Sequence, residues 1–197
     1  MKHVLCYLRG TLDNELCYRK CDDGLTLIGD SVADWASTDD SRSISGYCFS
    51  LNRTGPLISW KSRKHPTVAL SSCEAEYIAL VAGVQEGLYL TQIVSDISEV
   101  SDPVLIFEDN KGTIALSKNP INRQRSKHID VQYHFIRNVQ NAGKIIIKCC
   151  PTANMVADVM TKPATKIKLQ KYGSKFLVLK TCKFNTHVLL NIYSSTN

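Results

Sequence analysis

The stretch from Ser71 to about Ile97 contains no proline and constrains the fold most, because it predicts one long helix. Ser71 and Glu74 fit a capping box, in which a serine accepts a backbone N–H and a glutamate three positions later reaches back. One face of the predicted helix carries small or apolar residues at helical spacing, which are Ala79, Leu80, Gly83 and Gly87. Such a face lets a helix lie close against a sheet.

Glu76 lies on that same face, where a carboxylate is costly unless a cation or a metal ion pairs with it. Glu74 has a simple role as part of the helix cap and suits the positive end of the helix dipole. For Glu76 two interpretations stay open from the helix alone. It is either a first-turn residue at the edge of the buried face or one member of a site to which other segments bring acids.

The segments around this helix predict a mixed sheet. Residues 25–34, 43–51 and 57–61 precede the helix and have the pattern of strands, with a Gly and Pro turn between the last two. After it come a short apolar strand, two helices, another strand and a short helix, at 104–108, 111–117, 128–142, 144–149 and 152–160. This order fits an antiparallel meander followed by parallel crossovers, an α/β or α+β layer fold.

The net charge of +6 looks like a nucleic-acid signal until it is located in the chain. Of the 24 Lys and Arg, seven Lys follow Asp158, which leaves 17 against the 18 acidic residues of the chain. Binding of phosphates by residues 1–158 must therefore depend on local basic patches. The eight cysteines sit singly or as one adjacent pair, and no signal peptide or membrane-spanning run is evident. We therefore expect reduced thiols, an intracellular protein and no membrane partner.

Several acids fall at the ends of predicted elements. Asp109 follows the strand 104–108, at the sheet edge where ligands collect in α/β folds, although it also suits a helix cap. Asp158 lies in an apolar short helix, and the simple alternative to a site role is that it lies on the exposed face of that helix. Asp30 and Asp34 lie on the first strand. If these acids meet Glu76, the cluster repels itself unless it binds divalent cations, and oxygen ligands favour magnesium or manganese.

Seven motifs then occur in one order along the chain, and together they are highly specific. They are Ala33-Asp-Trp-Ala36, Arg42-Ser-Ile-Ser-Gly-Tyr47, Ile58-Ser-Trp-Lys-Ser62, Pro66 to Tyr77, Asp109-Asn110, Ser126-Lys-His-Ile-Asp130 and Ala157-Asp-Val-Met-Thr-Lys-Pro163. With them the chain resembles the ribonuclease H domain at the C-terminus of copia-type retrotransposon Pol polyproteins. Residues 1–20 resemble the end of the preceding reverse transcriptase region, 21–163 the ribonuclease H domain, and 164–197 form a basic tail.

The resemblance implies a ribonuclease H fold with a five-stranded mixed sheet. It also implies two Mg²⁺ (or Mn²⁺) ions, held by carboxylates, that hydrolyse the RNA strand of an RNA/DNA hybrid, with no small-molecule cofactor. Glu76, Asp109 and Asp158 match the acids that the family uses for metal binding and catalysis.

The first-strand acid departs from the family pattern, because Val32 stands where an aspartate that bridges both metals is expected. Asp30 and Asp34 are each two residues away, roughly 6.7 Å along a strand, so neither substitutes unless the strand slips. We therefore expect severely impaired hydrolysis, with Asp30 or Asp34 as the remaining candidate metal ligand.

Basic residues near the predicted site are candidates for phosphate contacts, which position a nucleic acid without reading its sequence. They are Arg42, Lys61, Arg63, Lys64, Lys127 and His128. Three functions stay open: a hybrid-specific ribonuclease, a defective copy of it that still binds nucleic acid, and a protein-interaction module that uses the fold as a scaffold.

Overall fold

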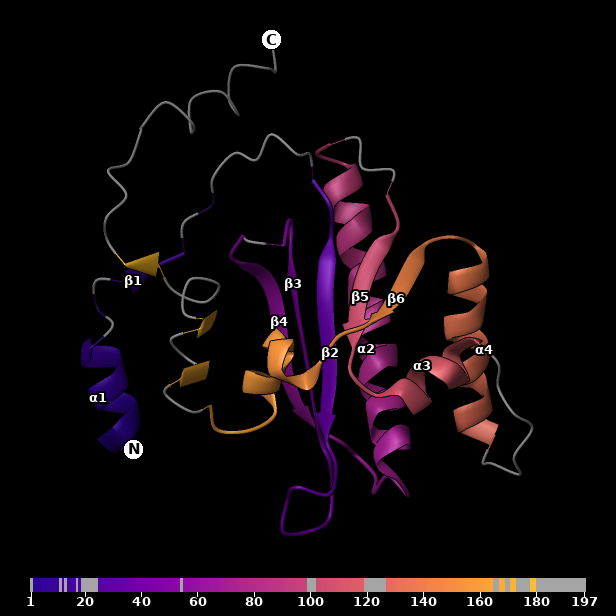
Figure 1. Ribbon diagram of the computed structural model, residues 1–197, viewed down its shortest axis with the longest axis horizontal. Coiled ribbons are helices and arrows are strands. Elements are labelled where there is room, and N and C mark those ends of the chain that lie inside the picture. Colours follow the sequence, from indigo (N-terminus) through magenta and orange to yellow (C-terminus); the bar gives the residue numbers. More distant parts are fainter. Residues whose placement is uncertain are drawn as a thin grey trace.

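A computed structural model describes residues 2–10, 12, 14–16, 18, 25–53, 55–98, 102–118, 127–164, 167–168, 171–172 and 178–179. Its centre is a five-stranded sheet with the order β4-β3-β2-β5-β6 (Figure 1). The strands are β2 (Ile28–Asp34), β3 (Ile44–Ser50), β4 (Leu57–Lys64), β5 (Val104–Glu108) and β6 (Ile145–Cys149). The first three pair antiparallel, whereas β2–β5 and β5–β6 pair parallel. The predicted mixed sheet is thus confirmed.

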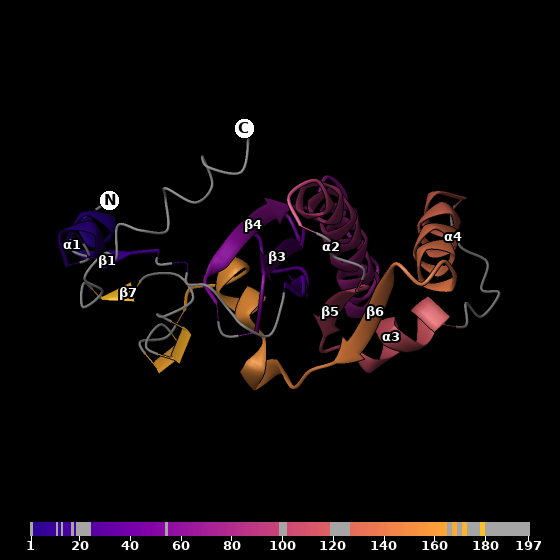
Figure 2. The same cartoon turned by 90° about the horizontal axis from the view of Figure 1, so that it is seen from above.

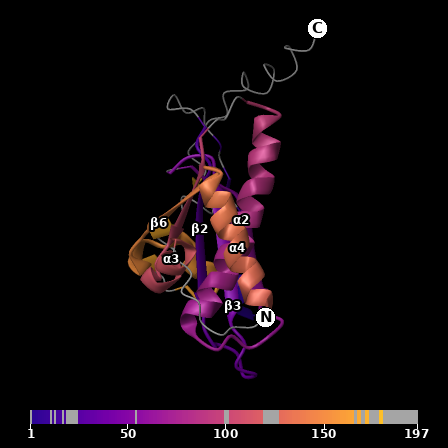
Figure 3. The same ribbon diagram turned by 90° about the vertical axis from the view of Figure 1, so that its right-hand side faces the viewer.

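One face of the sheet is covered by two helices, α2 (Ser72–Ser95) and α4 (Lys127–Asn141), as Figure 3 shows. The small-residue face of α2 is what allows this close approach. A Cβ on Gly87 would lie only 3.2 Å from the Val104 side chain and 3.3 Å from the Phe49 ring. The α2 helix is long and apolar enough to cross a membrane, but here it packs against the sheet, as core helices of that composition do.

The start of α2 explains the role of Glu74. The Ser71 side chain accepts the N–H of Glu74 at 3.2 Å, as a helix cap should. The Glu74 carboxylate accepts the N–H of Leu70 at 3.0 Å, one residue before the cap, so the box closes one position earlier than the motif predicts. Glu74 is therefore committed to the helix end.

The opposite face of the sheet is covered over β2, β3 and β4 by a short 3₁₀ helix, η2 (Val156–Met160), and another, η1 (Thr152–Asn154), precedes it (Figure 2). The sequence predicted one short helix over this span. Helix η2 lies against β3 at Gly46, where a Cβ would come within 2.7 Å of the Met160 Cβ. Because Gly46 pairs with Val32, the Val32 side chain faces η2 as well.

The remaining described elements are α1 (Lys2–Gly10), β1 (Asn14–Glu15), α3 (Lys111–Lys118) and β7 (Val178–Leu179). Helix α1 and the β1–β7 pair lie to one side of the sheet in Figure 1. Most of the predicted basic tail, residues 164–197, lies outside the described residues, as does the predicted basic loop at 122–126.

Candidate metal centre

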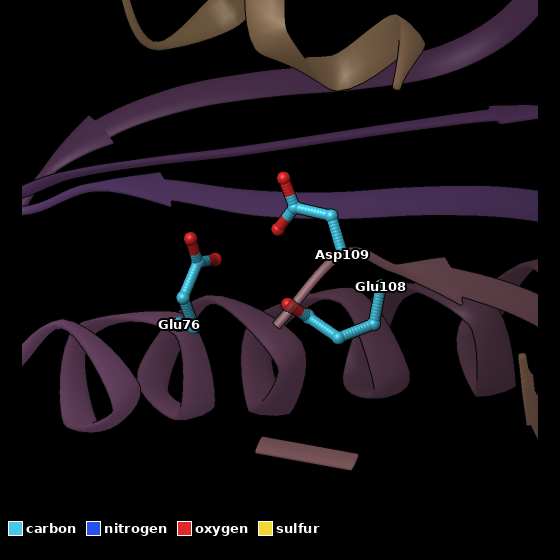
Figure 4. A group of neighbouring side chains, drawn as sticks. All are labelled: Glu76, Glu108 and Asp109. Carbon is cyan, nitrogen blue, oxygen red and sulfur yellow. The ribbon is translucent and has the colours of Figure 1, made fainter. Parts of the chain in front are cut away.

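Glu76 lies in the first turns of α2 and points toward β2 (Figure 4). Its Oε2 accepts the backbone N–H of Ala33 at 2.6 Å, which fixes the carboxylate beside the strand that carries Val32. Burial raises the pKa of Glu76 to about 8, although the hydrogen bond from Ala33 acts in the opposite direction. The interpretation of Glu76 as an edge residue is therefore wrong, because its carboxylate is buried between helix and sheet.

Asp109 follows β5 directly, at the carboxyl end of a parallel strand. Its Oδ2 accepts the hydroxyl of Thr152 at 2.7 Å, which ties it to η1. The neighbouring Asn110 caps α3, because its side-chain oxygen accepts the N–H of Thr113 at 3.1 Å. The sequence suggested two roles for Asp109, a helix cap and a site acid. Asn110 takes the role of cap, and the Asp109 carboxylate is left for the site.

Glu108, the last residue of β5, is the acid that the sequence interpretation missed. Its side chain is 0% exposed, and its Oε1 accepts the N–H of Asn110 at 3.1 Å. The Oε2 is buried and has no hydrogen-bond partner among the described residues. The sequence did carry a signal, since strand alternation puts Glu108 on the face of Val104 and Ile106, which pack under α2.

These three carboxylates converge. Glu76, Glu108 and Asp109 each offer an oxygen, and the three oxygens lie within 4.8 Å of one another (Figure 4). Burial raises the pKa of Glu108 well above its ordinary range, and the Glu76 carboxylate raises it further. An all-oxygen donor set with one buried, unpartnered oxygen fits a hard divalent cation such as Mg²⁺ or Mn²⁺.

Asp158, the third predicted site acid, lies outside this group. It sits in η2 with its carboxylate buried, and Lys162 Nζ pairs with its Oδ1 at 2.6 Å. Lys168 pairs with its other oxygen. Lys162 also lowers the pKa of Glu76, so its positive charge acts on both Asp158 and the three-acid group.

The first strand contributes no acid to the group. Asp30 borders a separate cavity of about 120 Å³, where its Oδ2 lies 3.9 Å from the Cys48 thiol. Asp34 is close enough to raise the pKa of Glu76, but it is not among the three converging acids. Val32, 4% exposed, packs against residues of η2. Continuous pairing with β3 from Ile28 to Asp34 holds this register.

A basic cleft of about 470 Å³ lies on the α2 face, between β4 and α2. Lys61, Arg63 and Lys64 line it together with His65, which is buried and hydrogen-bonded to Ser45. Burial lowers the pKa of His65, and Arg63 lowers it further, so the imidazole is neutral at pH 7. The positive charge of the cleft therefore comes from Lys61, Arg63 and Lys64, while the carboxylate of Glu86 also lines it.

Two of the predicted phosphate contacts are already paired with an acid. Asp40 lies 3.2 Å from the Arg42 guanidinium and 2.7 Å from the Lys64 ammonium. Lys61 and Arg63 form no ion pair within the part of the chain that the structure describes. The side chains of Lys127 and His128 lie outside the described residues, so their predicted role stays a prediction.

Comparisons with known proteins agree with this architecture. The chain matches no protein-family model. It is 36% identical over 182 residues to a retrovirus-related Pol polyprotein from transposon RE2 of Arabidopsis thaliana, which covers 91% of this chain and 12% of the relative. It is also 36% identical over 174 residues to the Pol polyprotein from transposon TNT 1-94 of Nicotiana tabacum, covering 87% of this chain and 13% of the relative. The chain thus spans about an eighth of the length of these relatives.

Among solved structures, the chain is similar to LC11-RNase H1 in complex with an RNA/DNA hybrid. The TM-score is 0.52 with 14% identity, and the alignment covers 73% of this chain and 99% of the other. At that identity the likeness shows a common fold. The sheet order and the helices on either side of it are therefore those of a ribonuclease H fold.

Proposed function

Because the chain is a homologue of one segment of the retrovirus-related Pol polyproteins of transposons and has a ribonuclease H fold, we propose that it binds RNA paired with DNA and hydrolyses the RNA strand poorly. The observation that carries the proposal has two parts. Glu76 and Asp109 meet as a hydrolytic site requires. The neighbouring strand β2, however, carries the alkyl side chain of Val32 instead of a carboxylate.

The protein's own groups prepare the site. The N–H of Ala33 holds Glu76, and the Thr152 hydroxyl holds Asp109, so both carboxylates are oriented before a cation binds. A bound divalent cation would activate water and neutralise charge on the phosphodiester. With Val32 on β2, the strand offers no carboxylate oxygen at this position. The continuous pairing of β2 with β3 supports this, since it leaves Asp30 and Asp34 two residues away on either side.

Binding of the hybrid would use the basic cleft. Phosphate contacts neutralise backbone charge and release counterions, so affinity falls steeply with salt. Lys61 and Arg63 are the best candidates, because they line the cleft on the edge strand and form no ion pair in the described part of the chain.

We expect the double substitution Lys61→Ala and Arg63→Ala to weaken hybrid binding and to flatten its salt dependence. Loss of two phosphate contacts should reduce the slope of log affinity against log salt by roughly 1.5. Fluorescence anisotropy with a labelled RNA/DNA hybrid, measured in EDTA at several salt concentrations, checks this result.

The matched control is Lys144→Ala with Lys148→Ala, which removes the same charge from exposed positions at the other edge of the sheet. The control should leave the slope unchanged. An equal loss in both double variants would mean that net charge alone governs binding and that the cleft has no part in it.

The alternative, a protein-interaction module that uses the fold as a scaffold, makes a different prediction in the same assay. It predicts no salt-dependent binding of the hybrid. The charge of the cleft and the orientation of the Glu76 and Asp109 carboxylates favour the nucleic-acid function.

A further inference from the structure

An exposed tryptophan follows the strand that borders the acid group. Trp35 comes directly after β2, and its side chain is 49% exposed. Its indole N–H donates to the backbone oxygen of Ala69 at 3.0 Å, which fixes the ring against the segment that precedes α2. Because Trp35 is two residues from Ala33, whose N–H holds Glu76, the ring lies at the same edge of the sheet as the site.

The ring is part of a larger exposed apolar surface. Val68 and Leu70 flank the buried Ala69 in the chain, and both of their side chains are exposed. Single exposed apolar side chains are ordinary on a protein, but a group of neighbouring ones is more often a contact surface. Trp35, Val68 and Leu70 together are called the indole platform below.

The chain directly after the ring is held in an uncommon conformation. Ala36 has a φ of +50°, in the left-handed region that residues other than glycine rarely adopt. Its N–H donates to Ser43 Oγ at 3.2 Å, and the Ser37 hydroxyl donates to the backbone oxygen of Asp34 at 3.1 Å. Strain of this kind is concentrated at functional sites. The ring is therefore held in place from both sides before any ligand binds.

The segment that carries Val68 and Leu70 joins the basic cleft to α2. His65 and Pro66 at its start line the cleft, and Ser71 at its end caps the helix. The indole platform thus connects the cations that are proposed to hold phosphates with the acid group. A nucleic acid that contacts both is the occupant that fits the platform by position.

The chemistry of the indole platform selects the part of the nucleic acid that it contacts. The bases of a duplex are stacked on one another, and a ring tied to Ala69 by its N–H does not insert between them. The apolar part of the outer surface is the sugars, which helices of the A form display in a wide and shallow minor groove.

We propose that the indole platform packs against the sugars of the bound RNA/DNA hybrid and supplies a non-ionic part of its affinity. The proposal rests on the proposed function and adds a contact surface to it, separate from the phosphate contacts of Lys61 and Arg63.

The first test is fluorescence anisotropy of a labelled hybrid in EDTA at several salt concentrations. We expect Trp35→Ala to weaken binding about tenfold at each salt concentration, as loss of an aromatic contact to a nucleotide does. The slope of log affinity against log salt should stay unchanged, because no phosphate contact is lost. Trp35→Phe, which keeps an aromatic ring, should retain most of the affinity.

Trp60→Ala is the matched control. Trp60 is 53% exposed, but it lies on β4 between Lys61 and Ser59, whose neighbours in the alternation face the cleft and α2. Its side chain therefore points to the opposite face of the sheet. This variant should leave both the affinity and the salt slope unchanged.

Tryptophan emission tests for direct contact, because Trp35 and Trp60 are the two tryptophans of the chain. In Trp60→Phe only Trp35 emits, and titration with the hybrid should change this emission with the midpoint that anisotropy gives. In Trp35→Phe the emission of Trp60 should stay unchanged. A purely structural role of Trp35 predicts no change of its emission on binding.

Unchanged affinity in Trp35→Ala, or an equal loss in Trp60→Ala, would overturn the indole platform and leave the proposed function standing. An equal change of Trp35 emission with single-stranded RNA and with the hybrid would mean base stacking, and would overturn the sugar contact. Thermal unfolding in EDTA shows whether Trp35→Ala is folded, and if it is not, the emission titration of Trp60→Phe decides. If the parent does not bind the hybrid at all, the proposed function fails and the platform fails with it.

Discussion

Replacing Val32 with aspartate is expected to raise the magnesium-dependent cleavage of the RNA strand in a hybrid by about 10²-fold. The reason is that the substitution places a carboxylate on β2, next to Ala33, whose N–H already holds Glu76. Metal ligation of this kind is worth several kcal/mol of transition-state stabilisation, and each 1.4 kcal/mol corresponds to about a factor of ten. Cleavage of an end-labelled RNA strand at equal protein concentration measures the effect.

The matched control is Val32→Asn, which has nearly the same shape as the aspartate but carries no charge. It should give no gain in rate. Because Val32 packs against apolar residues of η2, the aspartate should also lower the thermal stability in EDTA, and Mg²⁺ should restore part of it. Equal and robust cleavage by the parent and Val32→Asp would contradict the claim that Val32 impairs the site.

The stability of the metal-free protein should fall as the pH rises from about 4.5 to about 8. Burial raises the pKa of Glu76 to about 8 and that of Glu108 well above its ordinary range. Between the unfolded and folded pKa values the folded state binds more protons than the unfolded state, so a rise in pH favours unfolding. The change should be a few kcal/mol, which is roughly 5–10 °C in melting temperature for a chain of this size.

Thermal unfolding in EDTA across this pH range checks the prediction, and two variants locate its source. Glu76→Gln and Glu108→Gln should each flatten the pH profile, because an amide carries no charge to bury. Glu74→Gln is the control, since Glu74 only accepts the Leu70 N–H at the exposed start of α2. If the melting temperature of the parent does not change from pH 5 to pH 8, burial does not raise the pKa values of Glu76 and Glu108, and the prediction is wrong.

The secondary structure was predictable because its signals are local. The small-residue face of α2 and the serine cap at its start depend on residues three or four positions apart in the sequence, and both occur as predicted. The strands at β2, β3, β4, β5 and β6 follow from period-two or apolar runs. The span 152–160 was predicted less well, since a short segment with few local signals takes the form that its packing against β3 imposes.

The composition of the site was only partly predictable. The positions of Glu76 and Asp109 at element ends were enough to expect that they meet, and they do. The ion pairs of Asp158 with Lys162 and Lys168 could not be foreseen, because the direction of a side chain on a short 3₁₀ helix depends on tertiary contacts. Glu108 was read as the end of an apolar strand, and its burial beside Glu76 became visible only in three dimensions.

The amino-acid sequence by itself determined the order of the elements, the mixed sheet and the presence of an alkyl side chain at position 32, since each depends on residue type and local spacing. Only the tertiary structure decided which carboxylates share one space. Charges interact through space at a few ångströms, whereas Glu76 and Glu108 are separated along the chain by most of α2, the connection after it and the preceding residues of β5.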